Sequence, residues 1–216
     1  MSARRVLFAT VLLAACTASP PMDPHLATVP AASGQALVVR AVAAGSSRAT
    51  VAAFERTPAG WREVIAPLPA MVGRSGIVAG AEKREGDGHT PGGVHRLGTA
   101  FGYAPTGATK LAWRQATADD WWVDEATSPD YNHWVTGKPP VSAEAMRRGD
   151  GQYELGAVLE WNTAPVVPGR GSAIFLHVWQ APGEPTSGCV ALARADVARL
   201  LAWLDAARAP VVVVVP

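Results

Sequence analysis

The sequence predicts a mainly β domain, with a mixed sheet and a few helices at its edge. Three observations support this fold class. Short runs rich in Val, Ile, Thr and Trp recur along the chain and are separated by Gly, Pro and Ser, which is the pattern of strands joined by turns. Only one segment has the period of an amphipathic helix. Apolar residues make up 49% of the chain, enough for a substantial core.

The first residues have the layout of a secretory signal. Arg4 and Arg5 precede the apolar run 6–15, which small residues follow and which is too short to be a permanent membrane span. Leu13-Ala14-Ala15-Cys16 resembles the lipobox of bacterial lipoproteins, in which the cysteine is lipidated. The alternative is ordinary cleavage that discards Cys16. Both predict export to the periplasm or cell envelope, and a lipid on Cys16 is the only membrane anchor we expect.

A tether and a single domain are predicted after the signal at 1–16. Residues 17–35 lack hydrophobic periodicity and are rich in Pro, Ala and Ser, as in a flexible tether, and 36–216 form the domain. The net charge is +1 and no basic run is present. This composition argues against a nucleic-acid partner and against an electrostatic membrane patch.

Six runs are predicted to be strands: 36–42, 48–55, 61–65, 154–161, 172–179 and 210–215. The first three are separated by Gly45-Ser46-Ser47 and Thr57-Pro58-Ala59-Gly60, so this region is predicted to be a β-meander. The last run is continuously apolar, as in buried strands.

One helix is predicted over 194–207. Its apolar residues follow the spacing i, i+3, i+4 and i+7: Val197, Leu200, Leu201 and Leu204. Asp196 lies in the first turn, where the helix dipole favours a carboxylate. The segment 82–150 is rich in Gly, Pro, Asp and Trp and is predicted to form long loops, which are usually functional.

Cys189 is a lone thiol in the predicted domain, because the other cysteine is Cys16 in the signal. In the strand 173–179 alternate residues share a face, so His177 points the same way as Phe175 and away from Leu176. The connection 180–186 can bring Cys189 back beside His177, which would take the proton of the thiol. Gly188 allows a sharp turn and backbone N–H groups that face an oxyanion.

The alternative for both residues is structural. A lone cysteine is often a small buried apolar residue, and a histidine in an apolar strand is often a core residue with satisfied hydrogen bonds. The flanking sequence favours chemistry. His177 precedes Thr186-Ser187-Gly188-Cys189-Val190 by nine residues, and this order resembles the L,D-transpeptidase catalytic domain family of bacterial cysteine enzymes.

Three further stretches resemble the same family: 83–93 (KREGDGHTPGG), 122–132 with its Trp122-Val123-Asp124 and Ser128-Pro129-Asp130-Tyr131-Asn132, and 169–177 (GRGSAIFLH). The resemblance covers about 72–215 and implies a sandwich-like mixed sheet. It also implies that the exported protein acts on peptidoglycan stem peptides and needs no cofactor.

The resemblance implies a role for each residue of the site. Cys189 would be the nucleophile and His177 the general base and acid, and Thr186, Ser187 and Gly188 would complete the catalytic loop. The thiolate would attack the third, diamino acid residue of a tetrapeptide stem, release D-alanine and leave a thioester, which an amine or water resolves. The residues of the other motifs predicted to bind substrate are Arg170, Tyr131, Trp122 and His89.

The chain departs from the family pattern at two places. Better-known members have histidine where this chain has Ser187, and arginine where it has Ala191. The missing arginine removes a bidentate carboxylate binder, which affects substrate identity more than nucleophile chemistry. Arg170 or Arg194 would be candidates to replace it.

Several other polar residues have competing interpretations. Lys83, Glu85, Asp87 and His89 could line the cleft, although a hydrogen-bonded scaffold is the favoured role. The spacing of the histidines matches no compact ligand motif, so no metal is predicted. Three functions follow: an L,D-transpeptidase, a carboxypeptidase or amidase in which water resolves the thioester, and an inactive peptidoglycan-binding lipoprotein.

Overall fold

The computed structural model describes residues 23–216. The predicted signal and the lipidation of Cys16 lie outside the described residues. Within them the fold is mainly β, as predicted. The strands are β1 (Gln35–Ala41), β2 (Arg48–Thr57), β3 (Gly60–Met71), β4 (Ile77–Ala79), β5 (Thr90–Gly102), β6 (Trp113–Gln115), β7 (Asp120–Val123), β8 (Trp134–Thr136), β9 (Ala143–Ala145), β10 (Leu155–Leu159), β11 (Phe175–Val178), β12 (Val190–Leu192) and β13 (Val211–Val215).

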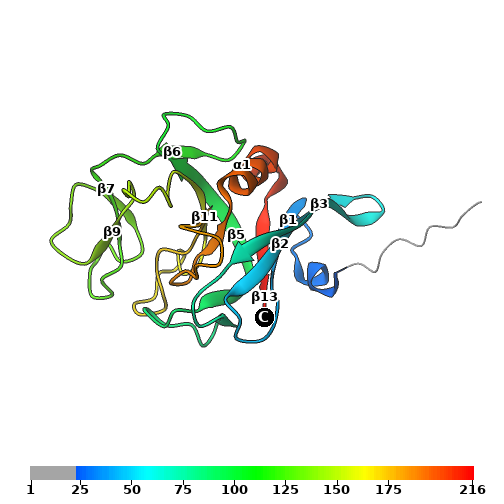
Figure 1. Cartoon of the computed structure of the whole chain (residues 1–216), viewed down its shortest axis with the longest axis horizontal. Coiled ribbons are helices and arrows are strands. Elements are labelled where there is room, and N and C mark those ends of the chain that lie inside the picture. The colour runs from blue at the N-terminus through cyan, green and yellow to red at the C-terminus, as the bar shows by residue number, and fades with distance from the viewer. Residues whose placement is uncertain (1–22) are drawn as a thin grey trace, which may run out of the picture.

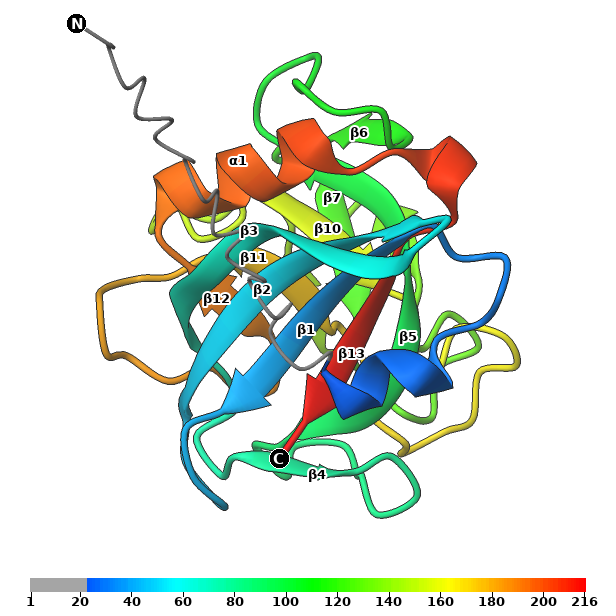
Figure 2. The same ribbon diagram turned by 90° about the vertical axis from the view of Figure 1, so that its right-hand side faces the viewer.

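The main sheet closes on itself. Its strand order is β10-β11-β12-β3-β2-β1-β13-β5, and β5 pairs again with β10. Two pairs in this ring, β1 with β13 and β11 with β12, are parallel. The sheet is therefore mixed, as predicted, and it curves into a closed barrel (Figure 2).

Strand β5 makes this closure possible and was not predicted. Its residues Gly93 to Arg96 pair with β13, and Leu97 to Gly102 pair with β10, so one long strand joins two parts of the ring. Pro91 and four glycines interrupt its apolar alternation. One of them, Gly92, is required by packing, because a Cβ there would lie 2.9 Å from the Val78 carbonyl oxygen.

The predicted tether is wrong for the residues that the structure describes. Pro24–Thr28 form a short 3-10 helix, η1, which lies against β13 (Figure 2). Leu26 is 1% exposed and packs with Val29, Val38 and Val213 on the outer face of β1 and β13. These apolar residues have no helical or strand period, which is why the sequence did not reveal their burial.

The helix α1 spans Arg194–Trp203, shorter than predicted. Leu204 is already extended (φ −66°, ψ 138°), and a 3-10 turn, η2 (Ala206–Arg208), follows. The four predicted apolar residues are all buried in the main core. Figure 2 shows α1 across one end of the curved sheet. No helix in residues 23–216 is long and apolar enough to span a membrane.

A second, small sheet has the order β8-β7-β9. It lies on the side of the molecule away from η1 (Figure 1). Asp120 fixes its first strand, because its carboxylate accepts hydrogen bonds from the Trp134 indole N–H at 2.8 Å and from the Thr117 hydroxyl at 2.7 Å. Although burial opposes ionisation, these donors hold the pKa of Asp120 well below its usual range.

Candidate active site

Cys189 and His177 are placed by two adjacent parallel strands. His177 is opposite Ala191 in the β11–β12 ladder, and Cys189 directly precedes β12. The two Cα atoms are separated by one inter-strand spacing between β11 and β12 and by two residues along the chain, which gives a distance of about 8 Å. The predicted alternation of β11 is confirmed: Leu176 and Val178 enter the main core, whereas Phe175 lies on the other face with Cys189.

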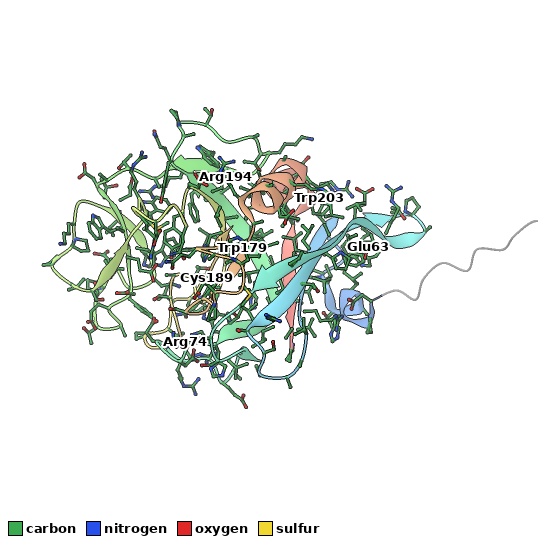
Figure 3. All side chains as sticks on the ribbon, viewed as in Figure 1. Glu63, Arg74, Trp179, Cys189, Arg194 and Trp203 are labelled. Carbon is green, nitrogen blue, oxygen red and sulfur yellow. The ribbon has the colours of Figure 1, made fainter. Side chains whose placement is uncertain are left out.

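Both side chains line one cavity of about 420 Å³ between the main sheet and the small sheet. Cys189 is 7% exposed and His177 is 3% exposed, so the pair lies at the bottom of this cavity and not at the surface. Figure 3 shows Cys189 near the middle of the molecule. The sulfur thus has polar surroundings on one side and packed side chains on the other.

The tautomer of His177 follows from its hydrogen bond. Its Nδ1 lies 2.8 Å from the backbone oxygen of Val178. Because a carbonyl oxygen only accepts, Nδ1 must carry the proton, and Nε2 of the neutral ring is left as an acceptor. A backbone carbonyl therefore orients this imidazole. Such a ring can take a proton from a thiol through Nε2.

Burial opposes charge on both members of the pair. It raises the pKa of Cys189 to about 12 and lowers the pKa of His177 to about 4. The thiol also has two backbone partners: Sγ donates to the Ala173 oxygen at 3.2 Å and accepts from the Phe175 N–H at 3.3 Å. The resting pair at neutral pH is thus a thiol beside a neutral imidazole.

The loop before Cys189 is held by the Thr186 hydroxyl. This hydroxyl donates to the Cys189 carbonyl oxygen at 2.7 Å and accepts from the Gly188 N–H at 3.1 Å. The Gly188 N–H is therefore engaged within the loop. Within residues 23–216 the Cys189 N–H has no hydrogen-bond partner, so it is free to donate to a bound group.

Gly188 has a separate, steric reason to be glycine. Its φ is +153°, and a Cβ would lie 2.9 Å from the His89 carbonyl oxygen. His89 thus approaches the catalytic loop through its backbone. Its side chain is about one third exposed and does not line the cavity.

Trp122 and Tyr131, predicted to bind substrate, support the site from behind. Trp122 packs edge-to-face on Phe175 with ring centroids 4.9 Å apart and is 6% exposed. The Tyr131 hydroxyl donates to the Glu85 carboxylate and accepts from the Gly171 N–H at 3.1 Å. Neither lines the cavity, because both are buried in the contact between the two sheets.

Asn132, next to Tyr131, fixes the loop that leads into β11. Its Oδ1 accepts from the Trp122 indole at 2.9 Å and from the Ala173 N–H at 3.1 Å. Its Nδ2 donates to the backbone oxygens of Trp161 and Asn162. Ala173 is held at φ +53°, and its carbonyl then reaches the Cys189 sulfur. This buried amide was not among the predicted site residues.

The two arginines considered as replacements for the missing one also lie outside the cavity. Arg170 donates to the Gly80 oxygen at 2.8 Å and lies over the Trp161 ring. Arg194 pairs with Glu154 at 2.7 Å and is exposed. In Figure 3 Arg194 is clearly apart from Cys189. Position in the motif did not identify which cations line the cavity of Cys189.

Six charged side chains line the cavity: Arg74, Lys83, Glu85, Asp124, Glu144 and Arg148. Lys83 and Glu85 combine both interpretations considered from the sequence, because they line the cavity and also form the scaffold. Lys83 pairs with Asp87 at 2.8 Å, and Glu85 accepts from the Ser172 hydroxyl at 2.7 Å. Arg74 and Arg148 were missed, because they come from segments distant in sequence.

Tyr153 connects the small sheet to the histidine and was also missed. Its ring lies edge-on to His177, with centroids 5.2 Å apart, and its hydroxyl donates to Glu144 at 2.6 Å. Burial raises the pKa of Glu144, whereas the hydrogen bond from Tyr153 opposes that shift. Glu144 comes from β9 and Tyr153 from the segment before β10, so only the fold brings this pair to the imidazole.

Comparisons with known proteins give one family match. The profile of the L,D-transpeptidase catalytic domain (YkuD) matches residues 51–213, which include Cys189, His177 and the whole barrel except β1, the first residues of β2 and the last residues of β13. No curated protein matches the chain.

Two solved structures resemble the fold. Both are of the helical cell shape determining protein Pgp2 from Campylobacter jejuni, one of them carrying a lysine-to-alanine substitution. The first has 13% identity and a TM-score of 0.39, and the match covers 83% of this chain and 46% of the solved chain. The second has 14% identity and a TM-score of 0.39, and the match covers 84% of this chain and 47% of the solved chain. The present chain thus spans about half the length of these solved chains.

Proposed function

Because the chain belongs to the L,D-transpeptidase catalytic domain family, we propose that it is an exported cysteine acyltransferase that remodels peptidoglycan through its stem peptides. The observation that carries this proposal is the shared cavity of Cys189 and His177, in which the imidazole presents an unprotonated Nε2. The cavity is polar and lies beside the nucleophile, so an extended peptide has a place to bind.

The chemistry follows from the neutral resting pair. As Sγ of Cys189 attacks the carbonyl of the diamino acid, Nε2 of His177 takes the thiol proton, so that a free thiolate never has to persist in the buried site. The Cys189 N–H donates to the oxyanion. The C–N bond then breaks, the imidazolium gives its proton to the leaving amine of D-alanine, and a thioester remains.

The second half-reaction reverses the proton transfer. An amine from a neighbouring stem approaches the thioester, neutral His177 removes its proton, and the new amide forms as the Cys189 thiol is restored. Water in place of the amine would give hydrolysis. Both outcomes use the same two side chains.

Export and anchoring complete the proposal. Stem peptides lie outside the cytoplasm, so a secretory signal at 1–16 and a lipid on Cys16 would place the domain beside its substrate. The packed segment from η1 onwards shortens the tether between such an anchor and the barrel.

Intact-mass detection of a covalent adduct tests the proposal. After exposure to a tetrapeptide stem, the protein should gain the mass of the stem less D-alanine. Cys189→Ala should gain none, and His177→Gln should form the adduct about 10²- to 10⁴-fold more slowly. His89→Gln is the matched control, because that side chain does not line the cavity and should leave the rate unchanged.

The products separate the remaining alternatives. Cross-linked dimers in a muropeptide digest identify a transpeptidase, whereas trimmed stems or a released attached group identify a hydrolase. A wild-type protein that forms no adduct with any stem or with a carbapenem would contradict the enzymatic proposal and favour a binding lipoprotein.

A further inference from the structure

The cavity has cations, but none at the position where related enzymes have one. Ala191 occupies the place of the arginine that follows the family motif, and it is 1% exposed. The cations that line the cavity are Arg74, Lys83 and Arg148. The inference below rests on the proposed function, because it names the group of the stem peptide that one of these cations would bind.

Two of the three cations already have carboxylate partners. Lys83 is 2% exposed, and its Nζ lies 2.8 Å from an Asp87 oxygen. The Arg148 guanidinium donates through Nε at 3.0 Å and Nη2 at 2.7 Å to one Asp150 carboxylate oxygen. Much of the attraction that these two side chains could offer to an anion is therefore offset.

Arg74 differs, because its hydrogen bonds go to neutral groups. Its Nη1 donates to the Ser187 hydroxyl at 3.3 Å and its Nη2 donates to the Gly86 carbonyl oxygen at 3.1 Å. In the part of the chain that the structure describes, no carboxylate pairs with it. Its charge is thus uncompensated, and it lies at the rim of the cavity that holds Cys189 (Figure 3).

The backbone fixes Arg74 to the catalytic loop. Its N–H donates to the Thr186 oxygen at 2.8 Å, and Gly73 forms a bridge with Thr186. The Arg74 side chain lies against Gly88, where a Cβ would come within 2.8 Å of Cζ. Any ligand that reaches Ser187 therefore meets a cation whose position is set by the same loop that sets the sulfur.

We propose that Arg74 binds a carboxylate of the stem peptide beside the scissile amide, and so takes the part that position 191 lacks. A planar guanidinium suits a carboxylate, and the Ser187 hydroxyl provides another donor beside it. Two groups of the donor stem carry this chemistry: the terminal carboxylate of the leaving D-amino acid and the side-chain carboxylate of a diamino acid.

Three synthetic tetrapeptide stems test the proposal on the wild-type protein alone. One has both carboxylates, the second ends in D-alaninamide, and the third has an amidated side-chain carboxylate. Loss of one charge-assisted pair should lower kcat/KM for acyl-enzyme formation by about 10- to 100-fold. The slower of the two amidated stems identifies the carboxylate that binds.

Variants assign the effect to one arginine. Arg74→Gln should lower kcat/KM for the unmodified stem by about 10- to 100-fold, mainly by raising KM. For the stem whose binding carboxylate is amidated, the same substitution should change kcat/KM by less than about 3-fold. Arg74→Lys should retain part of the preference for the unmodified stem over the amidated one, because lysine still supplies a positive point charge. Arg148→Gln should leave the ratio of kcat/KM between the unmodified and amidated stems unchanged. The substitution of the exposed Arg194 by Gln should leave both this ratio and kcat/KM itself unchanged.

The outcomes are distinguishable from failure of the proposed function. Equal rates with all three stems, an equal loss on every stem in Arg74→Gln, or loss of the preference in Arg148→Gln would overturn the assignment while acylation itself persists. A wild-type protein that forms no adduct with any stem would overturn both. Thermal unfolding of Arg74→Gln shows whether the loop has kept its fold, and the comparison of stems on the wild type does not depend on it.

Discussion

Cys189 and His177 form an electrically neutral pair, because burial opposes charge on both the thiol and the imidazole. Charge at Cys189 or His177 would have to be formed in a site that is almost closed to water, and the backbone partners of the sulfur are matched to a thiol: one acceptor, the Ala173 oxygen, and one donor, the Phe175 N–H. In the proposed mechanism Cys189 would therefore be activated only during attack, when Nε2 of His177 and the Cys189 N–H act together.

Alkylation of Cys189 should consequently be slow in the substrate-free protein. Burial raises the pKa of the thiol to about 12, so at pH 8 its iodoacetamide rate should be at least about tenfold below that of N-acetylcysteine and should still rise at pH 10. The same protein in urea should react at the rate of an ordinary thiol. Fast labelling at pH 6 would show that a thiolate persists at rest and would contradict this description.

At the scale of elements, the site depends on the junction between β11 and the small sheet. The loop that leads into β11 carries the strained Ala173, whose carbonyl contacts the sulfur. Tyr131 and Asn132 hold this loop from the opposite side. Tyr131, which the family resemblance marked for substrate binding, thus helps to hold the loop that contacts the Cys189 sulfur.

Asn132→Ala should destabilise the protein and slow acylation together. The substitution leaves the buried Ala173 N–H and Trp122 indole without partners and removes a donor from two half-buried backbone oxygens, at a cost of about 2 to 4 kcal/mol. Urea unfolding and the acylation rate measure the two effects. Asp130→Ala, an exposed change two residues away, should alter neither. Normal acylation in Asn132→Ala would show that the loop is placed by other contacts.

At the scale of the whole molecule, barrel closure sets the solvent access of the pair. The ring from β10 to β5 buries one face of β11, and the small sheet covers the other. His177 lies between them, and burial lowers its pKa from 6.5 to about 4. The folded protein therefore holds this ring neutral over a range in which the unfolded chain would protonate it.

Stability should fall as the pH drops from about 6.5 towards 4. In this window the unfolded chain binds more protons than the folded chain, so the free energy of unfolding decreases on acidification. His177 alone accounts for about 2 to 3 kcal/mol between pH 7 and 4.5, given its pKa change from 6.5 to about 4. Buried His95, whose pKa burial also lowers, adds to the loss.

Urea unfolding of wild type and His177→Gln at pH 7 and pH 4.5 isolates this contribution. Between pH 7 and pH 4.5 the free energy of unfolding of His177→Gln should fall by about 2 to 3 kcal/mol less than that of the wild type, whatever the stability of the variant at pH 7. The exposed His133→Gln should lose as much as the wild type. Equal losses in all three proteins would mean that His177 titrates alike in both states.

The sequence by itself determined the family, the mainly β class, the facing of β11 and the apolar residues of α1. These depend on local period and on short motifs, which act over a few residues. Only the tertiary structure decided that β5 closes a barrel, that η1 packs on β13, that Trp122 and Tyr131 are buried supports, and that Arg74 and Tyr153 reach the cavity. Those facts depend on contacts between residues far apart in the chain, and glycines required for close approach in β5 hide the very pattern that predicts a strand.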